Sequence, residues 1–139
     1  MADDIEVLTI GEPMALFVAD DAKTLKNVKH YTRFVSGAEL NFSVGMARLG
    51  HKVAYVSKVW EDPFGEYIKE FLTKNQIDNR YVRVDKSYLT GLQLKTKVEE
   101  GDPEVFNLRK NIAFSKMEPT DVEQIEWTTI KHLHVTGIP

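Results

Sequence analysis

The chain has 139 residues, 42% of them hydrophobic, which is enough for one compact domain with its own core. It contains no cysteine, which excludes disulfides, zinc fingers and thiol nucleophiles. Its 18 basic and 21 acidic residues give a formal net charge of −3, without the positive excess that nucleic-acid binding requires. No apolar run approaches the ~20 residues that span a bilayer. We therefore expect a soluble, cytoplasmic α/β domain with neither a nucleic-acid nor a membrane partner.

The first third of the chain predicts three strands. Residues 5–10 are a short run of β-branched and long apolar side chains, which is typical of a buried strand. The run ends at 11–13 in a Gly-Glu-Pro sequence that breaks regular structure. Residues 14–19 and 31–36 predict two further strands, and the polar residues 20–30 between them predict a loop.

Two helices and a strand follow. Residues 38–49 predict a helix that is apolar around nearly its whole circumference, which favours the interior, and Gly50 ends it. Residues 53–60 predict a second buried strand. Asp62 and Pro63 are a typical N-cap and first helical residue. The helix that they open carries an apolar stripe formed by Phe64, Tyr67, Ile68, Phe71 and Leu72.

The last part of the chain predicts a hairpin and further strands. Residues 81–85 predict a short strand. Residues 90–98 alternate apolar and polar side chains, and 105–110 return beside them, which predicts a hairpin with one polar face. A capping-box pattern at 120–123 predicts a short helix, and residues 133–138 predict a last strand.

Strands that alternate with helices predict an α/β fold with a largely parallel sheet of βαβ units. The alternating hairpin does not suit that layer, so we expect it to form a separate small sheet. The chain ends directly after an apolar strand, which such a fold normally covers on both faces with later helices. We therefore expect residues 1–139 to be a fragment of a longer fold, with a naturally short domain as the alternative.

A glycine and an amide at the start of the first predicted helix form one candidate site. Gly37 follows a strand and opens the helix, so a ligand can approach its backbone closely and receive hydrogen bonds from free N–H groups. Asn41 offers a donor and an acceptor that suit sugar hydroxyls, and it shares a helix stripe with Gly45 and Arg48. The same amide could equally satisfy a buried backbone group.

Polar side chains around the predicted hairpin form another candidate site. Arg109 and Asn107 share a strand face, with Gln93 opposite, and an arginine there can clamp a carboxylate or phosphate through paired hydrogen bonds. A strand arginine is more often only an exposed residue, and Gln93 has the same ambiguity. Glu12 follows the first strand, where open α/β sheets bind ligands, although an exposed loop acid would give the same pattern.

Other chemistry has little support in the sequence. His132 and His134 alternate on a strand, a spacing that metal ligands can use, but no third ligand is evident, so we expect satisfied core histidines and no metal site. The chain has no Walker-type glycine-lysine loop, no GxGxxG after the first strand and no GxSxG elbow. These residues alone indicate half a ligand site without a catalyst.

Several of these motifs together resemble the N-terminal signature of the ribokinase-like (PfkB) carbohydrate kinases. The resemblance lies in 37–43 (GAELNFS), 47–50 (ARLG) and 62–65 (DPFG) and, in matching order, in 11–12, 90–92 and 134–137. It covers essentially the whole chain but only about the first half of a family member. The sequence GAELN at 37–41 is most similar to the corresponding motif of the 2-keto-3-deoxygluconate kinases, and next to that of the fructokinases.

The resemblance implies a kinase that transfers phosphate from ATP, with Mg²⁺, to a hydroxyl of a sugar or sugar acid. It implies a Rossmann-like α/β fold, largely parallel and flanked by helices, with a small β-sheet lid from about 14–36 and 90–110. We expect a homodimer through these lid strands. A fructokinase or ribokinase-type enzyme, a non-catalytic sugar-binding module and an unrelated α/β nucleotide-binding domain are the alternatives.

The resemblance also implies roles for particular residues. Gly37, Ala38 and Asn41 would contact sugar hydroxyls, and Arg109 matches a lid arginine that helps to hold the substrate carboxylate in the ketodeoxygluconate branch. Glu12 is a further candidate for substrate binding, from its place after the first strand.

The sequence departs from the family pattern in two respects. Gln93 and Asn107 stand where the ketodeoxygluconate branch usually has tyrosine, although amides could replace the phenolic hydrogen bonds. The family's catalytic aspartate lies in a glycine-rich GAGD motif, and the only Gly-Asp pair here, 101–102, lies in the hairpin turn. Phosphoryl transfer depends on positioning and charge stabilisation, so we expect no catalytic residue in this chain and no activity from it alone.

Overall fold

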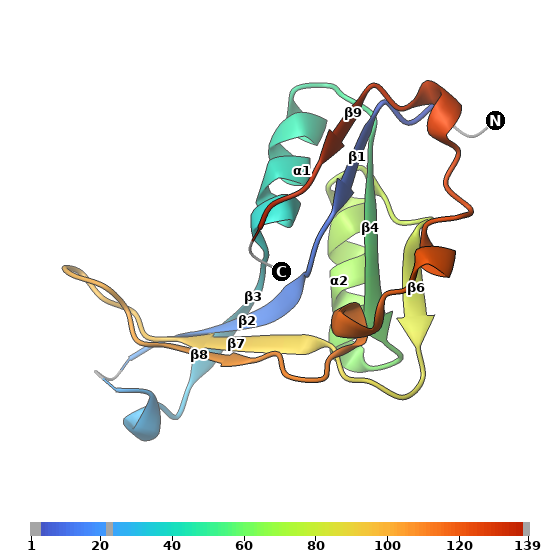
Figure 1. Ribbon diagram of the computed structural model, residues 1–139. Coiled ribbons are helices and arrows are strands. Elements are labelled where there is room, and N and C mark those ends of the chain that lie inside the picture. Colours follow the sequence, from blue (N-terminus) through green and yellow to red (C-terminus); the bar gives the residue numbers. More distant parts are fainter. Residues whose placement is uncertain (1–3, 22–23, 138–139) are drawn as a thin grey trace.

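The computed structural model describes residues 4–21 and 24–137, whose strands form a larger sheet and a small sheet (Figure 1). The strands are β1 (Val7–Ile10), β2 (Met14–Ala19), β3 (Tyr31–Ser36), β4 (Val53–Trp60), β5 (Ile77–Asp78), β6 (Val82–Asp85), β7 (Gly91–Lys95), β8 (Val105–Leu108) and β9 (His132–His134). The helices are α1 (Ala38–Arg48) and α2 (Pro63–Lys74), with short 3₁₀ turns at Leu25–Asn27, Ala113–Lys116, Pro119–Asp121 and Trp127–Thr129.

The larger sheet is parallel throughout the described residues, with the order β5-β4-β1-β9. β4 pairs along its first half with β5, where Val53 lies opposite Ile77, and along its second half with β6, where Ser57 lies opposite Val82. The predicted parallel sheet is therefore confirmed. The two-residue strand β5 was not predicted, because so short a segment carries no periodic pattern.

The two faces of the larger sheet are covered differently. Both helices lie on one face, where a core forms from Val7, Leu40, Val53, Tyr55, Val59, Ile68, Leu72, Ile77 and Val82. The chain after β8 covers the other face with 3₁₀ turns, and a second core forms there from Ile5, Leu8, Ala54, Val56 and Ile125. The stripe predicted for α2 is confirmed by its fully buried Ile68 and Leu72. The interior position expected for α1 is wrong, because only one face of this helix meets the sheet and Leu49 after it is 76% exposed.

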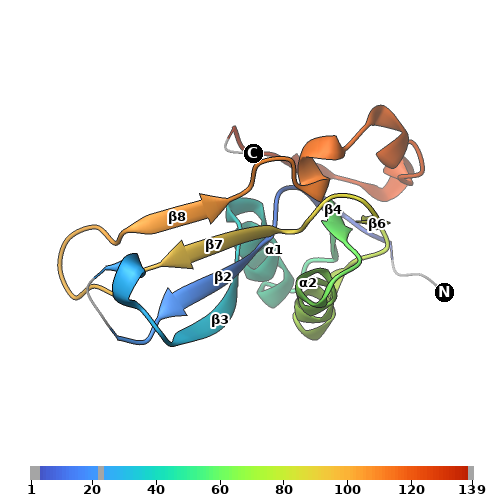
Figure 2. The ribbon, with the colours of Figure 1, turned by 90° about the horizontal axis from the view of Figure 1, so that it is seen from below.

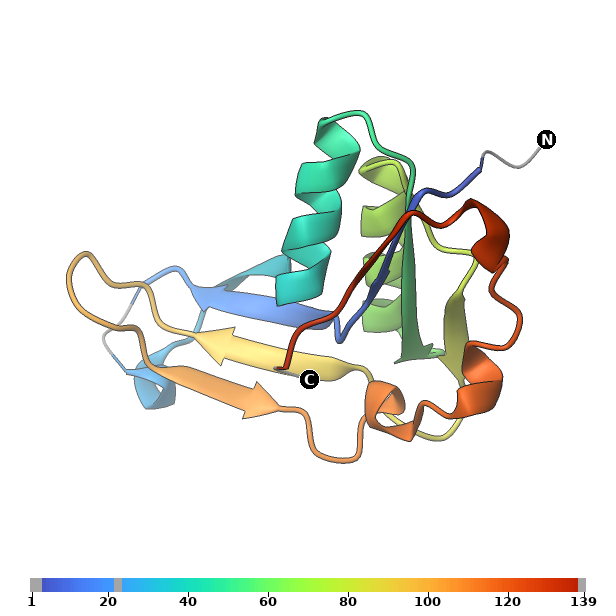
Figure 3. The same cartoon turned by 45° about the horizontal axis from the view of Figure 1, so that its top comes forward.

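The small sheet has the order β3-β2-β7-β8 and extends sideways from the carboxyl ends of β1 and β4 (Figures 2 and 3). β7 and β8 pair antiparallel, which confirms the predicted hairpin, and β2 joins β7 in parallel. The register places Phe17 opposite Arg33 on one face and Gln93 opposite Asn107 on the other.

The base of the small sheet is anchored to the start of α2. The ring of Phe17 meets Phe64 edge-on at 5.7 Å between centroids, and the Arg33 guanidinium lies 3.8 Å from the centroid of Tyr67. The start of β7 is tied to the same place, because the Thr90 hydroxyl donates to Asp62 Oδ1 at 3.2 Å.

Helix ends were predicted with mixed success. Asp62 caps α2 by accepting the Gly65 N–H at 2.5 Å, and Gly50 follows α1 with a φ of 92°, both as predicted. The capping box predicted at 120–123 is wrong. The N-cap is Glu118 instead, and the Asp121 carboxylate accepts a hydrogen bond from the Glu118 N–H. Pro119 therefore occupies the first position of the turn, where proline is favoured.

Several strand bounds differ from the predictions. β1 begins at Val7 and not at 5, β6 begins at Val82 and not at 81, and β7 ends at Lys95 and not at 98. Each strand is limited to the residues that pair with a neighbouring strand. β8 ends at Leu108, and the last strand is His132–His134, whereas 138 lies outside the described residues. None of the described helices is long and apolar enough to span a membrane.

Candidate functional site

The link between β1 and β2 brings Glu12 against the start of α1. The Glu12 carbonyl oxygen would lie 3.0 Å from a Cβ placed at Gly37, and Gly37 has a φ of 146°, a conformation that L side chains rarely adopt. The close approach that we expected from a ligand is therefore made, at this glycine, by the protein's own backbone.

Glu12 forms an ion pair with Arg109, across 97 residues of sequence. Arg109 Nε donates to Glu12 Oε2 at 3.2 Å, and Arg109 Nη2 lies 2.7 Å from Glu12 Oε1. The glutamate side chain is 6% exposed and the arginine side chain 33% exposed. The structure thus brings together two predicted site residues, but it places Glu12 as a buried partner of Arg109 and not as an exposed loop acid.

Buried ionisable groups surround this pair. Burial raises the pKa of the Glu12 carboxyl above its ordinary value, and the Glu39 carboxylate adds to the shift, whereas the Arg109 guanidinium opposes it. Burial also raises the pKa of the fully buried Tyr55 hydroxyl well above its ordinary value, with smaller contributions from Glu39 and Glu12. Tyr55 therefore stays protonated at neutral pH.

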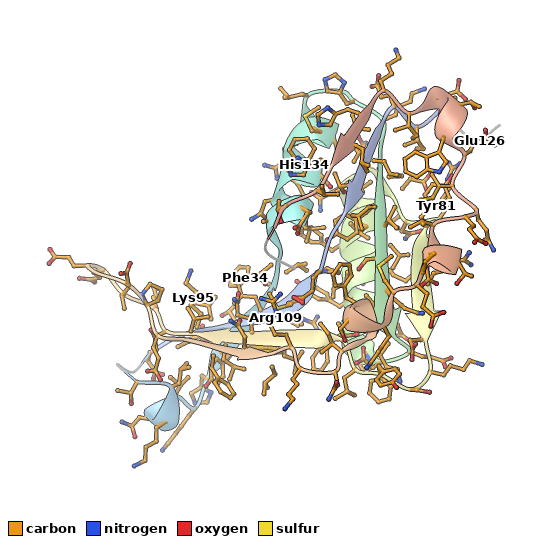
Figure 4. The ribbon with its side chains drawn as sticks, in the orientation of Figure 1. Phe34, Tyr81, Lys95, Arg109, Glu126 and His134 are labelled. Carbon is orange, nitrogen blue, oxygen red and sulfur yellow. The ribbon has the colours of Figure 1, made fainter. Side chains whose placement is uncertain are left out.

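The polar face of the small sheet carries the predicted amides. Gln93 Nε2 donates to Asn107 Oδ1 at 2.8 Å, as their opposite positions on β7 and β8 require. Phe34, Lys95 and Arg109 project to the same side of the sheet, the side on which α1 and β9 also lie (Figure 4). Phe34 is 49% exposed, and neither it nor Lys95 was predicted as a site residue. Strand alternation could have placed both beside Gln93 once the pairing was known.

The residues at the start of α1 border the same corner. Ala38 is exposed and Gly37 half-buried. The Asn41 side chain is exposed, one turn into the helix, where its backbone N–H donates to the Gly37 carbonyl at 3.0 Å. Contact between Asn41 and a sugar stays a prediction.

A buried acid in α1 was missed by the sequence reasoning. Glu39 is 1% exposed and accepts a hydrogen bond from the Thr136 hydroxyl after β9. A Cβ placed at Gly11 would lie 2.5 Å from Glu39 Cβ, so the glycine makes room for this side chain. One signal was available, because an acidic residue in the first turn of an otherwise apolar helix interacts favourably with the helix dipole.

A hollow of about 580 Å³ lies on one side of the Glu12–Arg109 pair. The rest of its lining consists of one residue of β1 and six residues of the segment after β8: Ile10, and Phe114, Ser115, Met117, Glu118, Pro119 and Val122. Gly37, Asn41 and Gln93 lie outside this lining. Another hollow, of about 560 Å³, lies at the opposite edge of the sheet near Ile5, Val53 and Ile77, away from the strand ends at which α/β sheets bind ligands.

His132 and His134 take part in ring stacking. The His134 ring stacks on Phe42 of α1 at 3.8 Å between centroids, and His132 lies 6.0 Å from the same ring. His132 is exposed, so the core position expected for it is wrong: β9 lies at an edge of the described sheet. Within residues 4–21 and 24–137, no three His, Asp or Glu side chains are placed to hold a metal ion.

A parallel sheet with a small sheet at its carboxyl edge, and polar side chains between the two, defines a ribokinase-like fold. The pfkB family carbohydrate kinase model matches residues 4–139, and the chain belongs to this family. The 2-dehydro-3-deoxygluconokinase of Bacillus subtilis (strain 168) is 40% identical to it over 136 residues, which are 97% of this chain and 42% of that protein.

Solved structures agree with this assignment. The PfkB protein from Polaromonas sp. JS666 superposes with a TM-score of 0.91 at 36% identity, over 96% of this chain and 45% of that one. An uncharacterized sugar kinase, PH1459 from Pyrococcus horikoshii, solved in complex with ATP, superposes with a TM-score of 0.77 at 31% identity, over 83% of this chain and 37% of that one. The present chain thus spans less than half the length of these relatives.

The start of α2 is not available to the phosphates of ATP, the nucleotide bound in the PH1459 structure. Unoccupied backbone N–H groups at a helix start or loop are a common cradle for nucleotide phosphates. The start of α2 is already occupied by the Asp62 carboxylate, and the start of α1 lies in the corner that holds the candidate sugar residues. The two described helix starts therefore offer no separate cradle for a nucleotide beside the candidate sugar residues.

Proposed function

We propose that this chain is the sugar-binding part of an ATP-dependent carbohydrate kinase that phosphorylates a hydroxyl of 2-keto-3-deoxygluconate or a closely similar sugar acid. The acceptor would rest in the corner between the small sheet and the start of α1. Family membership supports the reaction class, and the 2-dehydro-3-deoxygluconokinase relative supports the sugar acid.

The observation that carries this proposal is the Arg109 guanidinium, held at the inner end of a polar sheet face. Arg109 is one-third exposed, and the amide pair Gln93–Asn107 lies on the same face of the sheet. A guanidinium binds a carboxylate through paired hydrogen bonds, and amides donate to and accept from hydroxyls. Gly37, Ala38 and Asn41 would complete the site from α1.

Catalysis would need residues other than these. Phosphoryl transfer in this family would require ATP, Mg²⁺ and a base beside the acceptor hydroxyl, and neither described helix start offers a separate cradle for the nucleotide. Within this chain, the small sheet would orient the sugar and exclude water from one side. We therefore propose that residues 1–139 alone are inactive and that the full-length protein is the kinase.

We also propose that the small sheet pairs two copies of the protein. Two large apolar side chains on the face of this sheet opposite to Gln93 and Asn107 are exposed: Phe106 (54%) and Leu108 (46%). Exposed apolar groups of this kind mark protein interaction surfaces. Sedimentation at micromolar concentration should show a dimer, and a monomer would contradict this part of the proposal.

A substrate panel on the full-length protein tests the function. It should contain 2-keto-3-deoxygluconate, fructose and ribose, with ADP formation as the readout. Preferential phosphorylation of the sugar acid is expected. Preference for a neutral sugar would favour a fructokinase or ribokinase-type enzyme, and sugar binding without turnover would favour a non-catalytic module.

A further inference from the structure

We propose that Glu12 is a positioning residue that holds Arg109 in one orientation, so that the remaining edge of the guanidinium receives the carboxylate of an acidic sugar. This inference rests on the proposed function. It gives Glu12 a task different from the substrate contact expected from the sequence, because Glu12 acts here through Arg109.

The geometry of the pair leaves one edge of the guanidinium available. A guanidinium carries five N–H donors in a rigid planar fork. The contacts to Glu12 use Nε and Nη2, along one edge. Nη1 makes no hydrogen bond with any other residue of the described ranges, so the Nη1–Nη2 edge can bind a second carboxylate side by side.

The glutamate is the fixed member of the pair. Glu12 is 6% exposed, and its neighbours hold the backbone: Gly11 N–H donates to the Val56 carbonyl at 3.2 Å, and Pro13 restricts the next φ. Arg109 instead follows the end of β8 and is 33% exposed. An exposed arginine has many rotamers, and a rigid, buried carboxylate selects one of them.

The ion pair also determines how an acid is recognised. Arg109 paired with Glu12 carries little net charge, so a substrate carboxylate gains affinity from two aligned hydrogen bonds more than from long-range attraction. Removing the Glu12 charge should therefore weaken binding through lost alignment. A purely electrostatic arginine would predict the opposite, since the loss of a nearby carboxylate would strengthen the attraction.

The test compares three variants of the full-length protein with 2-keto-3-deoxygluconate and fructose. Glu12→Gln keeps the shape of the side chain and removes its charge, and Glu12→Asp keeps the charge but shortens the side chain. Glu100→Gln, exposed in the hairpin turn, removes the same charge elsewhere on the small sheet and serves as the matched control. KM and kcat are measured for each sugar, with a thermal melt to verify folding.

We expect Glu12→Gln to raise the KM for the sugar acid about tenfold, with its kcat and the KM for fructose within twofold of the wild type. Glu12→Asp should raise the same KM severalfold, and Glu100→Gln should change nothing. If Glu12→Gln does not fold, Glu12→Asp decides. An unchanged or lower KM for the acid, or an equal rise for both sugars, would overturn the positioning role. A wild-type protein that phosphorylates no sugar would instead overturn the proposed function itself.

Discussion

The hydroxyl of Thr136, just after β9, donates a hydrogen bond to the buried carboxylate of Glu39 in the first turn of α1. This bond joins segments 97 residues apart: the start of α1 and the chain just after β9, the strand that pairs with β1. A polar seam continues along the helix, because the Ser43 hydroxyl donates to the Glu39 carbonyl at 2.8 Å and lies 2.7 Å from the Thr9 hydroxyl. Buried hydrogen bonds between α1 and the sheet therefore fix the position of the helix whose first residues border the candidate site.

Gly11→Ala should destabilise the protein. The new Cβ would lie 2.5 Å from Glu39 Cβ and would force the helix or the β1–β2 link to move. We expect the free energy of unfolding to fall by about 1–3 kcal/mol, as measured by urea denaturation. Gly45→Ala in α1 is the control, since nothing lies within 4 Å of its Cβ, and it should raise the same free energy by about 0.5–1 kcal/mol. Equal effects of the two substitutions would contradict the packing described for Gly11.

Asp62→Ala should remove the cap of α2 and loosen the start of β7. The Asp62 Oδ1 atom accepts hydrogen bonds from both the Gly65 N–H and the Thr90 hydroxyl. We expect a loss of about 1–2 kcal/mol in the free energy of unfolding. Asp62→Asn keeps an acceptor at the cap and should retain most of the stability, so a loss as large as that of the alanine variant would argue against capping as the cause.

Arg109→Ala in the full-length protein should raise the KM for an acidic sugar more than for a neutral one. A hydrogen bond to a charged group contributes about 1.5–3 kcal/mol, which corresponds to about a tenfold or greater rise for the acid. Arg109→Lys keeps the charge but loses the planar fork, so it should recover little of the affinity. Steady-state kinetics with both sugars provide the measurement, and equal rises would contradict a carboxylate clamp.

Asp85 should make part of the stability dependent on pH. Hydrogen bonds from the backbone N–H groups of Ser87 and Tyr88, at 2.6 and 2.9 Å, lower the pKa of the Asp85 carboxyl, although burial opposes the shift. A lowered pKa in the folded state stabilises the protein above the unfolded aspartate pKa of about 3.9, and this contribution is lost as the pH falls through the folded value.

Unfolding of wild type and Asp85→Asn between about pH 2 and 6 tests this dependence. The difference in their free energies of unfolding should be largest above about pH 4 and should shrink as the pH falls. Asp102→Asn, at an exposed position in the hairpin turn, is the control and should follow the wild-type curve. Parallel curves for the Asp85 variant would contradict the prediction.

Much of the fold could be predicted because local patterns and tertiary packing agree. The bounds of β2, β3 and β4 match the predicted ranges, since each strand is a clear apolar or alternating run between breakers. The environment of α1 could not be predicted in the same way. Its apolar circumference suggested an interior helix, yet only one face meets the sheet, and the buried residues include Glu39 and Ser43.

Some residues of the candidate site could be named from the sequence, but their contacts could not. Glu12 and Arg109 were each identified, but neither periodicity nor a motif relates residues 97 positions apart, so their pairing emerged only from the topology. The Gln93–Asn107 hydrogen bond follows directly from the hairpin register, which the alternation had already indicated. Tyr55 was read only as part of a buried strand, because a tyrosine in an apolar run shows no sign of neighbouring acids.

The attachment of the small sheet to α2 limits the way in which this sheet can move. Phe17 and Arg33, opposite each other on β2 and β3, are both fastened to aromatic rings in the first turns of the helix. A hinge at the base of the sheet would have to break both attachments at once. We therefore expect the small sheet to close over a bound sugar by bending at the end that lies away from α2. Substitutions at these two contacts would then change the rate at which the sheet opens, although neither contact involves the sugar.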